Sequence, residues 1–270
     1  MTSPLASDLL DFSGRHVFVA GGSSGINLAI AEAFAQRGAS VSIASRSVER
    51  VAAAVEQLRR HGGKVGGHSA DVREYEAVEA VLAGAREAFG PIDVLVSGAA
   101  GNFVAPALGM SSKGFRTVVD IDLVGSFNVL RAGHAHLRRP GASVINISAP
   151  QASNPTALQA HVCAAKAGVD MLTRVLAMEW GPEGVRVNSI VPGPIGDTEG
   201  VRRLAPDPDA LAQMAASIPL GRFGRTAEVA DMAMVLSSPL AAFVTGAVIP
   251  VDGGSSLPGG RDLSAAVKAA

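Results

Sequence analysis

Short runs of apolar and β-branched residues alternate along this chain of 270 residues with longer stretches of helical periodicity. Such runs are typical of strands in a parallel sheet, whose two faces are both covered by helices. Between two of them, Val51, Val55 and Leu58 fall on one helix face. Since βαβ crossovers are right-handed, the alternation predicts a doubly wound, three-layer α/β fold with about seven mostly parallel strands. Strands are predicted at 16–20, 41–44, 94–96, 144–147, 185–191 and 248–251, and before Asp71.

The composition argues against several other kinds of protein. With 48% hydrophobic and 17% charged residues, the chain is too apolar to remain disordered. Its 23 Lys and Arg residues nearly balance 24 Asp and Glu, so no long-range field would attract nucleic acid. No apolar run reaches the roughly 20 residues that span a bilayer, so we expect no membrane partner. One cysteine and no leader of charged then apolar residues predict a cytoplasmic location.

One stretch interrupts the alternation of strands and helices. Residues 192–219 contain several prolines and two adjacent arginines. In open α/β sheets, ligands bind outside the carboxyl ends of the strands, and long connections there often serve as lids. We therefore expect residues 1–270 to form one domain, with 192–219 as a mobile substrate lid within it.

A glycine-rich turn joins the first predicted strand to the next predicted helix. Gly21 and Gly25 can turn tightly and bring backbone N–H groups close to a pyrophosphate, whose charge is favoured at a helix N-terminus. A turn without a ligand could have the same glycines, but the strand and helix around it favour a dinucleotide site of the Rossmann type. A third glycine is expected where Asn27 stands, which leaves open how closely a cofactor approaches. The predicted contacts are Gly21, Gly22, Ser23, Ser24, Gly25 and Ile26.

The end of the second predicted strand distinguishes the two nicotinamide cofactors. An acidic residue there would bind the adenosine 2′-hydroxyl, whereas Arg46 matches a 2′-phosphate. We therefore predict NADP(H), with a solvated surface arginine as the alternative. After the third strand, Asp71 could clamp the adenine or cap the next helix. The predicted contacts at this end are Ser45, Arg46, Ser47, Arg50, Asp71 and Val72.

Several motifs resemble the short-chain dehydrogenase/reductase superfamily over nearly the whole chain. Besides the glycine turn and Asp71, they are the Ser97-Gly98-Ala99-Ala100-Gly101 turn, Lys166 and Pro192-Gly193-Pro194-Ile195. Members bind a nicotinamide cofactor at the strand ends and usually assemble as dimers or tetramers. The resemblance thus implies a homo-oligomer and an NADP-binding Rossmann-fold domain over 1–270. It also implies cofactor contacts at Ala99, Ala100, Lys166, Pro192, Gly193, Pro194, Ile195 and Thr198.

The usual active site of that superfamily contains Asn, Ser, Tyr and Lys, of which only Lys166 is present here. Val162 stands at the tyrosine position, Ala149 at the serine position and Asp122 at the asparagine position. Hydride addition to a ketone creates a localised alkoxide, which needs a proton donor of matched pKa. A conjugated thioester instead spreads the charge to its oxygen, where a polarising hydrogen bond and a proton from water suffice. The sequence therefore favours reduction of a C=C bond.

One branch of the superfamily, the 2,4-dienoyl-CoA reductases and particularly the peroxisomal type, is similar to this chain in scattered segments. The resemblance implies NADPH-dependent reduction of a 2,4-dienoyl-CoA to a 3-enoyl-CoA in unsaturated fatty acid β-oxidation. It also implies that Asp122 and Lys166 are the catalytic residues. The C-terminus lacks a Ser-Lys-Leu type address, which agrees with the cytoplasmic expectation. The similar segments are 99–103, 105–106, 120–122, 125–129, 179–182, 192–195, 198–200, 202–203 and 238–240.

The two catalytic candidates have complementary expected roles. Lys166 would hydrogen-bond the nicotinamide ribose and place positive charge near the developing enolate, unless it is merely a surface lysine. Asp122 would orient the water that delivers the proton, unless its pairing with Lys166 is only structural. His161 could act as an acid or contact the substrate, or could be a buried structural histidine. Cys163 is interpreted as small core filling rather than a nucleophile.

The resemblance to the dienoyl-CoA branch also implies contacts to an acyl-CoA substrate. Cationic side chains suit its phosphates and Phe103 suits the acyl chain. Arg202 could take the place of Arg203, since neighbours on a helix point about 100° apart. No metal is expected. The predicted substrate contacts are Arg73, Phe103, Ser111, Ser112, Lys113, His161 and Arg203.

Two other functions stay open at this point. A 3-oxoacyl or other ketone reductase could use His161 or water as its acid, although the missing tyrosine disfavours this. A catalytically silent NADP-binding scaffold would also explain the departures at Asp122, Ala149 and Val162. Separately, apolar side chains on several faces of 115–130 and 169–180 exceed what one sheet face needs, which predicts helix pairing between subunits.

Overall fold

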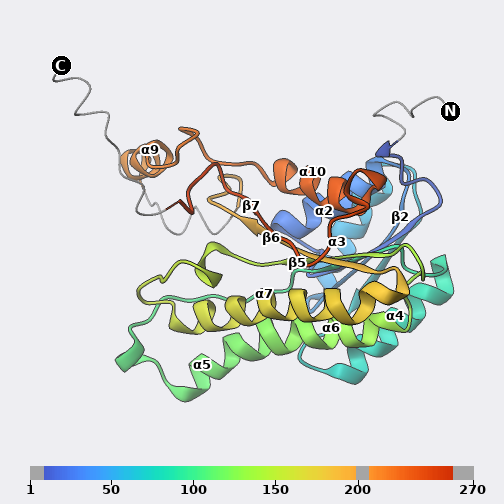
Figure 1. Cartoon of the computed structure of the whole chain (residues 1–270), viewed down its shortest axis with the longest axis horizontal. Helices are drawn as coiled ribbons and strands as arrows, with labels where there is room; N and C mark the ends of the chain where they lie inside the picture. The colour runs from blue at the N-terminus through green and yellow to red at the C-terminus, as the bar shows by residue number, and fades with distance from the viewer. Residues whose placement is uncertain (1–8, 199–206, 258–270) are drawn as a thin grey trace.

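The computed structural model describes residues 9–198 and 207–257 of the chain. At its centre, seven parallel strands form one sheet in the order β3-β2-β1-β4-β5-β6-β7 (Figure 1). The predicted doubly wound α/β fold is therefore confirmed. The strands are β1 His16–Ala20, β2 Ser40–Ser45, β3 Val65–Ser69, β4 Val94–Ser97, β5 Ser143–Ile147, β6 Arg186–Pro192 and β7 Val248–Val251.

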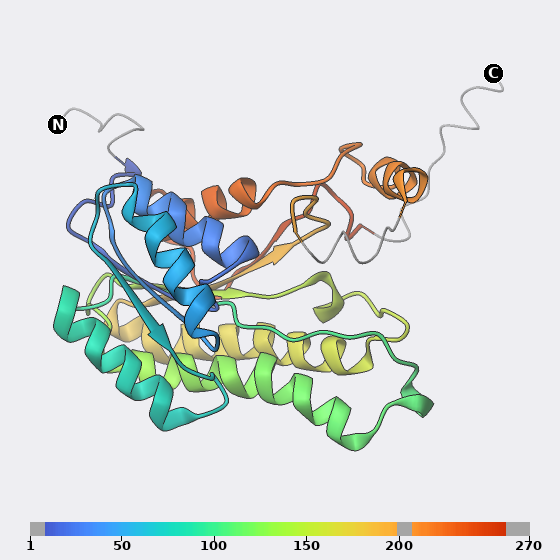
Figure 2. The same ribbon diagram turned by 180° about the vertical axis from the view of Figure 1, so that it is seen from behind.

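Helices cover both faces of this sheet, which gives the molecule three layers (Figures 1 and 2). Every residue of β1, β4 and β5 is buried, as the two covered faces require. One face carries α2 Gly25–Gln36, α3 Val48–Arg59 and α10 Thr226–Ser237. The other carries α4 Tyr75–Phe89, α6 Gly125–His134 and α7 Ala160–Trp180. The other α-helices within residues 9–198 and 207–257 are α5 Ser112–Val119 and α9 Pro208–Ala216.

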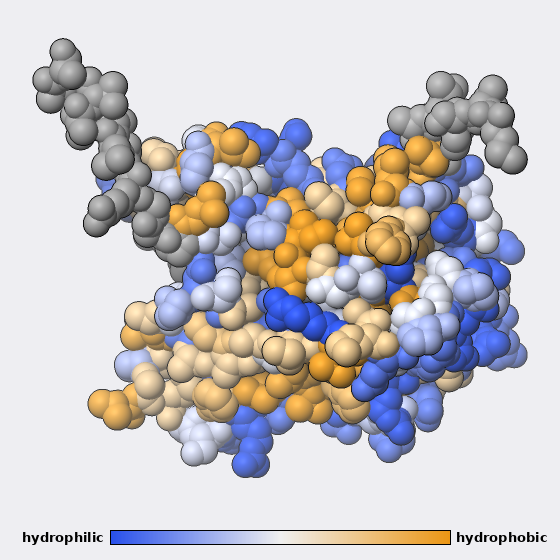
Figure 3. Space-filling view, viewed as in Figure 1, coloured by the Kyte–Doolittle hydropathy of each residue, from blue (hydrophilic) through white to orange (hydrophobic). Residues whose placement is uncertain are grey.

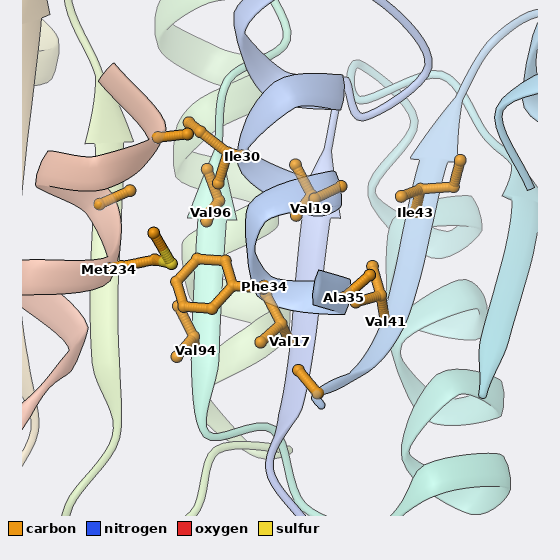
Figure 4. Packing of buried hydrophobic residues seen from close by; sticks show 14 of the residues in the cluster. Val17, Val19, Ile30, Phe34, Ala35, Val41, Ile43, Val94, Val96 and Met234 are labelled. Atoms are coloured by element: carbon orange, nitrogen blue, oxygen red, sulfur yellow. The ribbon is translucent and has the colours of Figure 1, made fainter. Parts of the chain in front are cut away.

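Helix α2 is anchored to the middle of the sheet by apolar packing. Phe34 lies beside Val17 of β1 and Val94 of β4, with Met234 of α10 on its other side (Figure 4). None of these four residues is more than 4% exposed. This packing fixes the N-terminus of α2, at the end of the glycine turn, above the ends of β1 and β4.

The edge strand β3 has the weakest sequence signal of the seven. Its sequence, VGGHS, holds two glycines and shows no apolar alternation. A Cβ atom on Gly67 would lie 2.5 Å from Val55 and 2.7 Å from Val51 of α3, so the missing side chain lets α3 pack directly on the strand. The glycines of β3 therefore serve the packing of α3 and give no apolar strand pattern. For this reason the sequence predicts the strand only from the position of Asp71, which follows it.

The order in which strands are added to the sheet reverses beside β1, and this reversal places the site. From β1 the strand order runs through β2 to β3 on one side, and from β4 to β7 on the other. Loops that leave neighbouring strands to opposite sides open a crevice at the strand ends, where α/β proteins bind ligands. Here the crevice lies beyond Ala20 and Ser97, which are partners at the ends of β1 and β4.

Short helical turns complete the described structure. A π-helical turn, η2 Asp120–Val124, joins α5 to α6 without a break. Turns of this kind are rare and frequently occur at functional sites. The others are the 3₁₀ turns η1 Ala107–Gly109, η3 Pro150–Ala152, η4 Gly181–Glu183 and η5 Pro239–Ala241.

Glu228 holds the start of α10 against the loop that precedes it. Its carboxylate accepts hydrogen bonds from both Arg222 Nη atoms, at 2.9 and 2.7 Å, and from the Arg225 N–H at 2.8 Å. Arg222 and the Arg225 amide lower the pKa of Glu228 to about 2. Gly224, within this loop, exchanges backbone hydrogen bonds with Pro194 and Gly196. The network therefore supports the stretch that leads to Thr198.

We expect Glu228→Gln to lower the melting temperature at neutral pH, because the carboxylate loses its charge-assisted partners. Since the folded-state pKa of about 2 lies below the ordinary 4.5, this stabilisation is present above pH 4.5 and is lost as the pH falls through about 2. Thermal unfolding measured across pH should show the difference from wild type shrinking over that window. The exposed Glu87→Gln serves as control, and a pH-independent difference for Glu228→Gln would contradict the assignment.

Candidate active site

A cavity of about 470 Å³ opens at the carboxyl ends of β1, β2, β4 and β5. It is the crevice that the reversal of strand order predicts, and most of the predicted cofactor contacts line it. Those that do so are Gly21, Ser23, Ser24, Gly25, Ile26, Ser45, Arg46, Arg50, Asp71, Val72, Ala99, Ala100, Lys166 and Thr198.

The other predicted cofactor contacts lie just outside this wall. Gly22 packs against the sheet, where a Cβ atom would be 2.8 Å from Ile43 of β2. Ser47 accepts the Arg50 N–H at 3.2 Å and so caps α3. Gly193 packs on Asp252, and Pro192 is buried at the end of β6. Pro194 and Ile195 line a separate hollow.

The glycine turn leaves backbone N–H groups free at the start of α2. Gly21 has φ +81°, and a Cβ atom there would lie 2.9 Å from the Ala99 nitrogen, so only glycine fits. Ser24 precedes α2 in an extended conformation, and its side chain makes no capping hydrogen bond. The first N–H groups of a helix have no partner within the helix. They therefore suit an anionic ligand such as a pyrophosphate.

Asn27, which stands where a third glycine was expected, links this turn to β4. Its amide Nδ2 donates to the Gly98 carbonyl at 2.7 Å. A Cβ atom on Gly98 would collide with the Asn27 carboxamide, whose Oδ1 is the nearest atom. Asn27 thus fills the space that a side chain at position 98 would take. The two residues are complementary, and the turn keeps its close approach to β4.

This complementarity predicts non-additive stabilities. Gly98→Ala should destabilise the protein, by roughly 1–3 kcal/mol for overpacking, because its methyl group meets the Asn27 amide. In an Asn27→Ala background the same change should cost at least about 1 kcal/mol less, because the obstructing amide is gone. Urea unfolding of the two single variants and the double variant measures this coupling. Strictly additive losses would show that the two side chains do not compete for space.

Charged side chains gather at the end of the cavity near β2 and β3. Arg46 and Arg50 line the cavity wall. Asp71 forms a two-pronged ion pair with Arg73, whose Nη2 and Nε lie 2.6 and 3.0 Å from its carboxylate oxygens. Arg73 holds the pKa of Asp71 below its usual range. Asp71 does not cap α4, since the residue before that helix is Glu74.

A buried ion pair lies at the opposite end of the cavity. Lys166 and Asp122 have side chains 6% and 1% exposed, and Lys166 Nζ lies 3.5 Å from Asp122 Oδ2. Lys166 also donates to the Ile147 carbonyl at 3.0 Å, and Asp122 Oδ1 accepts the Gly101 N–H at 2.7 Å. Burial raises the pKa of Asp122, although Lys166 and the Gly101 N–H oppose the shift. The surface alternative for Lys166 is wrong, because α7 places it inside.

Apolar side chains occupy the two positions at this end of the cavity that correspond to the tyrosine and serine of the superfamily. Val162, one turn before Lys166 on α7, and Ala149, just beyond β5, both line the cavity. The tertiary structure thus brings together all four positions compared in the sequence. In the described parts of the chain, no three His, Cys, Asp or Glu side chains form a metal-binding group.

His161 and Cys163 lie beside this end of the cavity but do not line it. The His161 ring is fully buried, and its centroid lies 4.3 Å from that of Phe103. Neither ring nitrogen has a hydrogen-bond partner among the described residues. Cys163 is only partly buried, and its Sγ is 4.0 Å from the Thr156 carbonyl, so the expectation of core filling is wrong.

The predicted substrate contacts are spread over several places. Ser111 and Ser112 line a second hollow beside Phe115, where Ser111 also caps α5 by accepting the Gly114 N–H at 3.0 Å. Lys113 is exposed on α5. Arg73 pairs with Asp71 and does not itself line the cavity. Arg203 and its alternative Arg202 lie outside the described residues.

Sequence reasoning missed three polar residues of the cavity wall, Asn102, Ser148 and Gln151. The Ser148 Oγ and Gln151 Oε1 atoms are buried and have no hydrogen-bond partner among the described residues. Buried polar atoms without partners are costly and indicate a missing ligand or water. The available signal for Ser148 and Gln151 was their position just after the fifth predicted strand, at the edge of the sheet where ligands bind. With the free N–H groups of α2 and the two arginines, they fit a nicotinamide dinucleotide lying along the cavity.

Comparison with known proteins agrees with this geometry. Residues 20–256 match the family described as enoyl-(acyl carrier protein) reductase. The chain is 33% identical to an NADPH-bound short-chain oxidoreductase from Pseudomonas aeruginosa PAO1 that contains an atypical catalytic centre. The match covers 90% of this chain and 97% of that one, with a TM-score of 0.85. The chain belongs to the short-chain dehydrogenase/reductase family, as the sequence motifs predicted.

Within that family, the chain is similar to proteins named 2,4-dienoyl-CoA reductases. It is 44% identical to the peroxisomal, (3E)-enoyl-CoA-producing enzyme of Pongo abelii, over 91% of this chain and 85% of that protein. It is 37% identical to a probable (2E)-enoyl-CoA-producing reductase of Bacillus subtilis, over 90% of this chain and 97% of that protein. The resemblance stated from the sequence is therefore confirmed.

Proposed function

We propose that this protein reduces a 2,4-dienoyl-CoA to a 3-enoyl-CoA with NADPH. One observation carries the proposal: the Lys166–Asp122 pair faces the cavity, while Val162 and Ala149 stand where the superfamily has its tyrosine and serine. The relatives with 37–45% identity that are named dienoyl-CoA reductases support the same substrate class. An acyl-CoA is therefore the proposed partner.

The chemistry of this substrate suits a site without an acidic side chain at the carbonyl. The nicotinamide cofactor, when bound, supplies a hydride to the far end of the diene. The electrons then move through the conjugated chain to the thioester oxygen, and a proton added next to the carbonyl gives the 3-enoyl product. A ketone offers no such delocalisation and needs a proton at its own oxygen. Val162 cannot provide it.

Lys166 and Asp122 have distinct tasks in this scheme. The Ile147 carbonyl and Asp122 direct two of the three Lys166 N–H bonds, so the third is free to bind the cofactor ribose or a water molecule. Its positive charge favours the negative charge that develops on the acyl chain. Asp122 holds Lys166 in place and is fixed in turn by the Gly101 N–H. Together they can order the water that delivers the proton.

Purified protein should oxidise NADPH, followed by absorbance, in the presence of 2,4-hexadienoyl-CoA. Lys166→Ala and Asp122→Ala should each reduce turnover by about 10²-fold or more, since each removes a group that positions the proton. Acetoacetyl-CoA should remain unreduced. Turnover of acetoacetyl-CoA alone would support a ketone reductase. Detectable NADPH binding with neither substrate consumed would support the catalytically silent scaffold.

The preference for NADPH rests on the arginines at the end of β2. Arg46 and Arg50 line the cavity beyond Ser45, and no described carboxylate forms an ion pair with either. A 2′-phosphate would supply the missing negative charge, which an adenosine 2′-hydroxyl cannot do. Asp71 does not supply this negative charge, because Arg73 already pairs with its carboxylate.

Arg46→Asp should therefore weaken the preference for NADPH over NADH. We expect kcat/KM with NADPH to fall at least about tenfold, as loss of a charge-assisted contact implies, while the value with NADH changes little. Steady-state kinetics with each cofactor measures both effects. The exposed Arg60→Asp, at the far end of α3, is a matched control for the change of charge. An unchanged preference in Arg46→Asp would refute the role of Arg46.

A homo-oligomer, dimer or tetramer, is proposed on the basis of apolar surface over α5, α6 and α7. Apolar residues cover much of this side in the space-filling view (Figure 3). Monomers rarely expose large continuous apolar patches. Packing two copies through these helices would cover the patch. Its large exposed side chains include Phe115, Phe127, Met171, Val175 and Met178.

The cellular location and the lid stay predictions. Among the described residues, no helix is long and apolar enough to cross a membrane. Relatives from Pongo abelii, Arabidopsis thaliana and Saccharomyces cerevisiae are named peroxisomal, whereas the sequence predicts a cytoplasmic location for this chain. Of the proposed lid, 192–219, the structure describes 192–198 and 207–219, including α9. Thr198 lines the cavity, which is consistent with a lid over the substrate.

A further inference from the structure

Gln151 presents a fixed carboxamide to the catalytic end of the cavity. It lies on the turn η3, two residues beyond Ala149, and lines the same wall as Lys166. Its Nε2 donates to Gln159 Oε1 at 2.8 Å. Its Oε1 is buried and has no partner among the described residues. Gln159 therefore holds one end of the amide, and no described protein group holds the other.

The group that holds Gln151 is itself held. Gln159, only 7% exposed, donates from Nε2 to Asn102 Oδ1 at 3.3 Å. The segments that carry Asn102 and Gln159 are also joined by the backbone, where the Ala105 N–H donates to the Leu158 carbonyl at 3.0 Å. Three carboxamides thus form a chain that runs from the loop after β4 to the cavity wall beside β5.

The hydrogen bonds that link these three carboxamides can run in either direction. Each carboxamide carries a donor at one end and an acceptor at the other. If all three turn end for end, both hydrogen bonds persist with donor and acceptor exchanged, and the Gln151 NH₂ group takes the position that has no partner. A carbonyl oxygen bound there would select this arrangement, because it accepts hydrogen bonds and donates none.

We infer that Gln151 donates a hydrogen bond to the thioester carbonyl oxygen of the acyl-CoA; this inference rests on the proposed function. That oxygen gains negative charge when the hydride adds to the diene, and a fixed donor stabilises it without transferring a proton. The side chains of Ala149 and Val162, which line this end of the cavity, have no hydrogen-bonding group. Gln151 therefore supplies the polarising contact that reduction of a conjugated thioester requires, and water ordered by Lys166 and Asp122 supplies the proton.

The main test compares Gln151→Leu with wild type in NADPH oxidation by 2,4-hexadienoyl-CoA. We expect kcat to fall at least about tenfold, as for loss of one donor to a developing oxyanion. The NADPH dissociation constant, measured by fluorescence, and the melting temperature should stay near wild type. Gln36→Leu, the same change at an exposed position at the end of α2, is the control and should have wild-type kinetics.

A second variant gives a signature that a merely structural residue would not show. Gln151→Glu places a carboxylate opposite the charged oxygen, so its kcat should fall further than that of Gln151→Leu at high pH. Protonation restores an O–H donor, and its kcat relative to wild type should therefore rise as the pH falls. Gln159→Leu should lower kcat similarly, with no added loss when combined with Gln151→Leu.

Three results would overturn the inference. Wild-type kcat in stable, NADPH-binding Gln151→Leu would do so, provided that the wild type reduces the dienoyl-CoA. A kcat ratio of Gln151→Glu to wild type that does not change with pH would also do so. Ser148→Ala alone reproducing the loss, with Gln151→Leu unaffected, would transfer the contact to the unpartnered Ser148 hydroxyl. If the wild type itself reduces no dienoyl-CoA, the proposed function fails. If the wild type reduces it and Gln151→Leu does so equally well, only the role of Gln151 fails.

Discussion

The buried pairing of Lys166 with Asp122 is the interaction on which the catalytic end of this protein depends. An ammonium group and a carboxylate are costly to bury unless each finds charged and hydrogen-bonding partners. Here the Ile147 carbonyl and the Gly101 N–H complete the set, and both belong to the carboxyl ends of sheet strands or the loops just after them. The pair therefore forms only when β4, β5, the π-helical turn and α7 are all in place.

The lack of an acidic hydroxyl beside this pair restricts the chemistry. A site with Val162 and Ala149 can stabilise charge that reaches it through a conjugated system, but it cannot protonate a localised alkoxide. Fixed dipoles then matter more than acids. Turned so that its NH₂ group is free, the Gln151 carboxamide, held by Gln159 and Asn102, is such a dipole. In this view the site does not protonate the carbonyl oxygen. It stabilises that oxygen with a hydrogen bond from a neutral amide.

The fold could be predicted closely because buried parallel strands are marked by continuous apolar runs. The predicted strands 16–20 and 248–251 match β1 and β7 residue for residue. Strand β3 could be placed only from Asp71 beyond its end, because its glycines serve the packing of α3 and carry no strand pattern. The cofactor end was predictable for a similar reason, since the strand, glycine turn and helix are consecutive in the chain.

The sequence by itself determined the layer architecture, the phosphate-binding turn and the absence of the tyrosine, because each depends on neighbouring residues or on a short, fixed spacing. Only the tertiary structure decided which polar groups lack partners. Gln159 and Asn102 are 57 positions apart in the chain, and Asn27 and Gly98 are 71 apart. Hydrogen bonds and steric exclusion act over a few ångströms in space, so contacts between residues this far apart appear only once the sheet has brought their loops together.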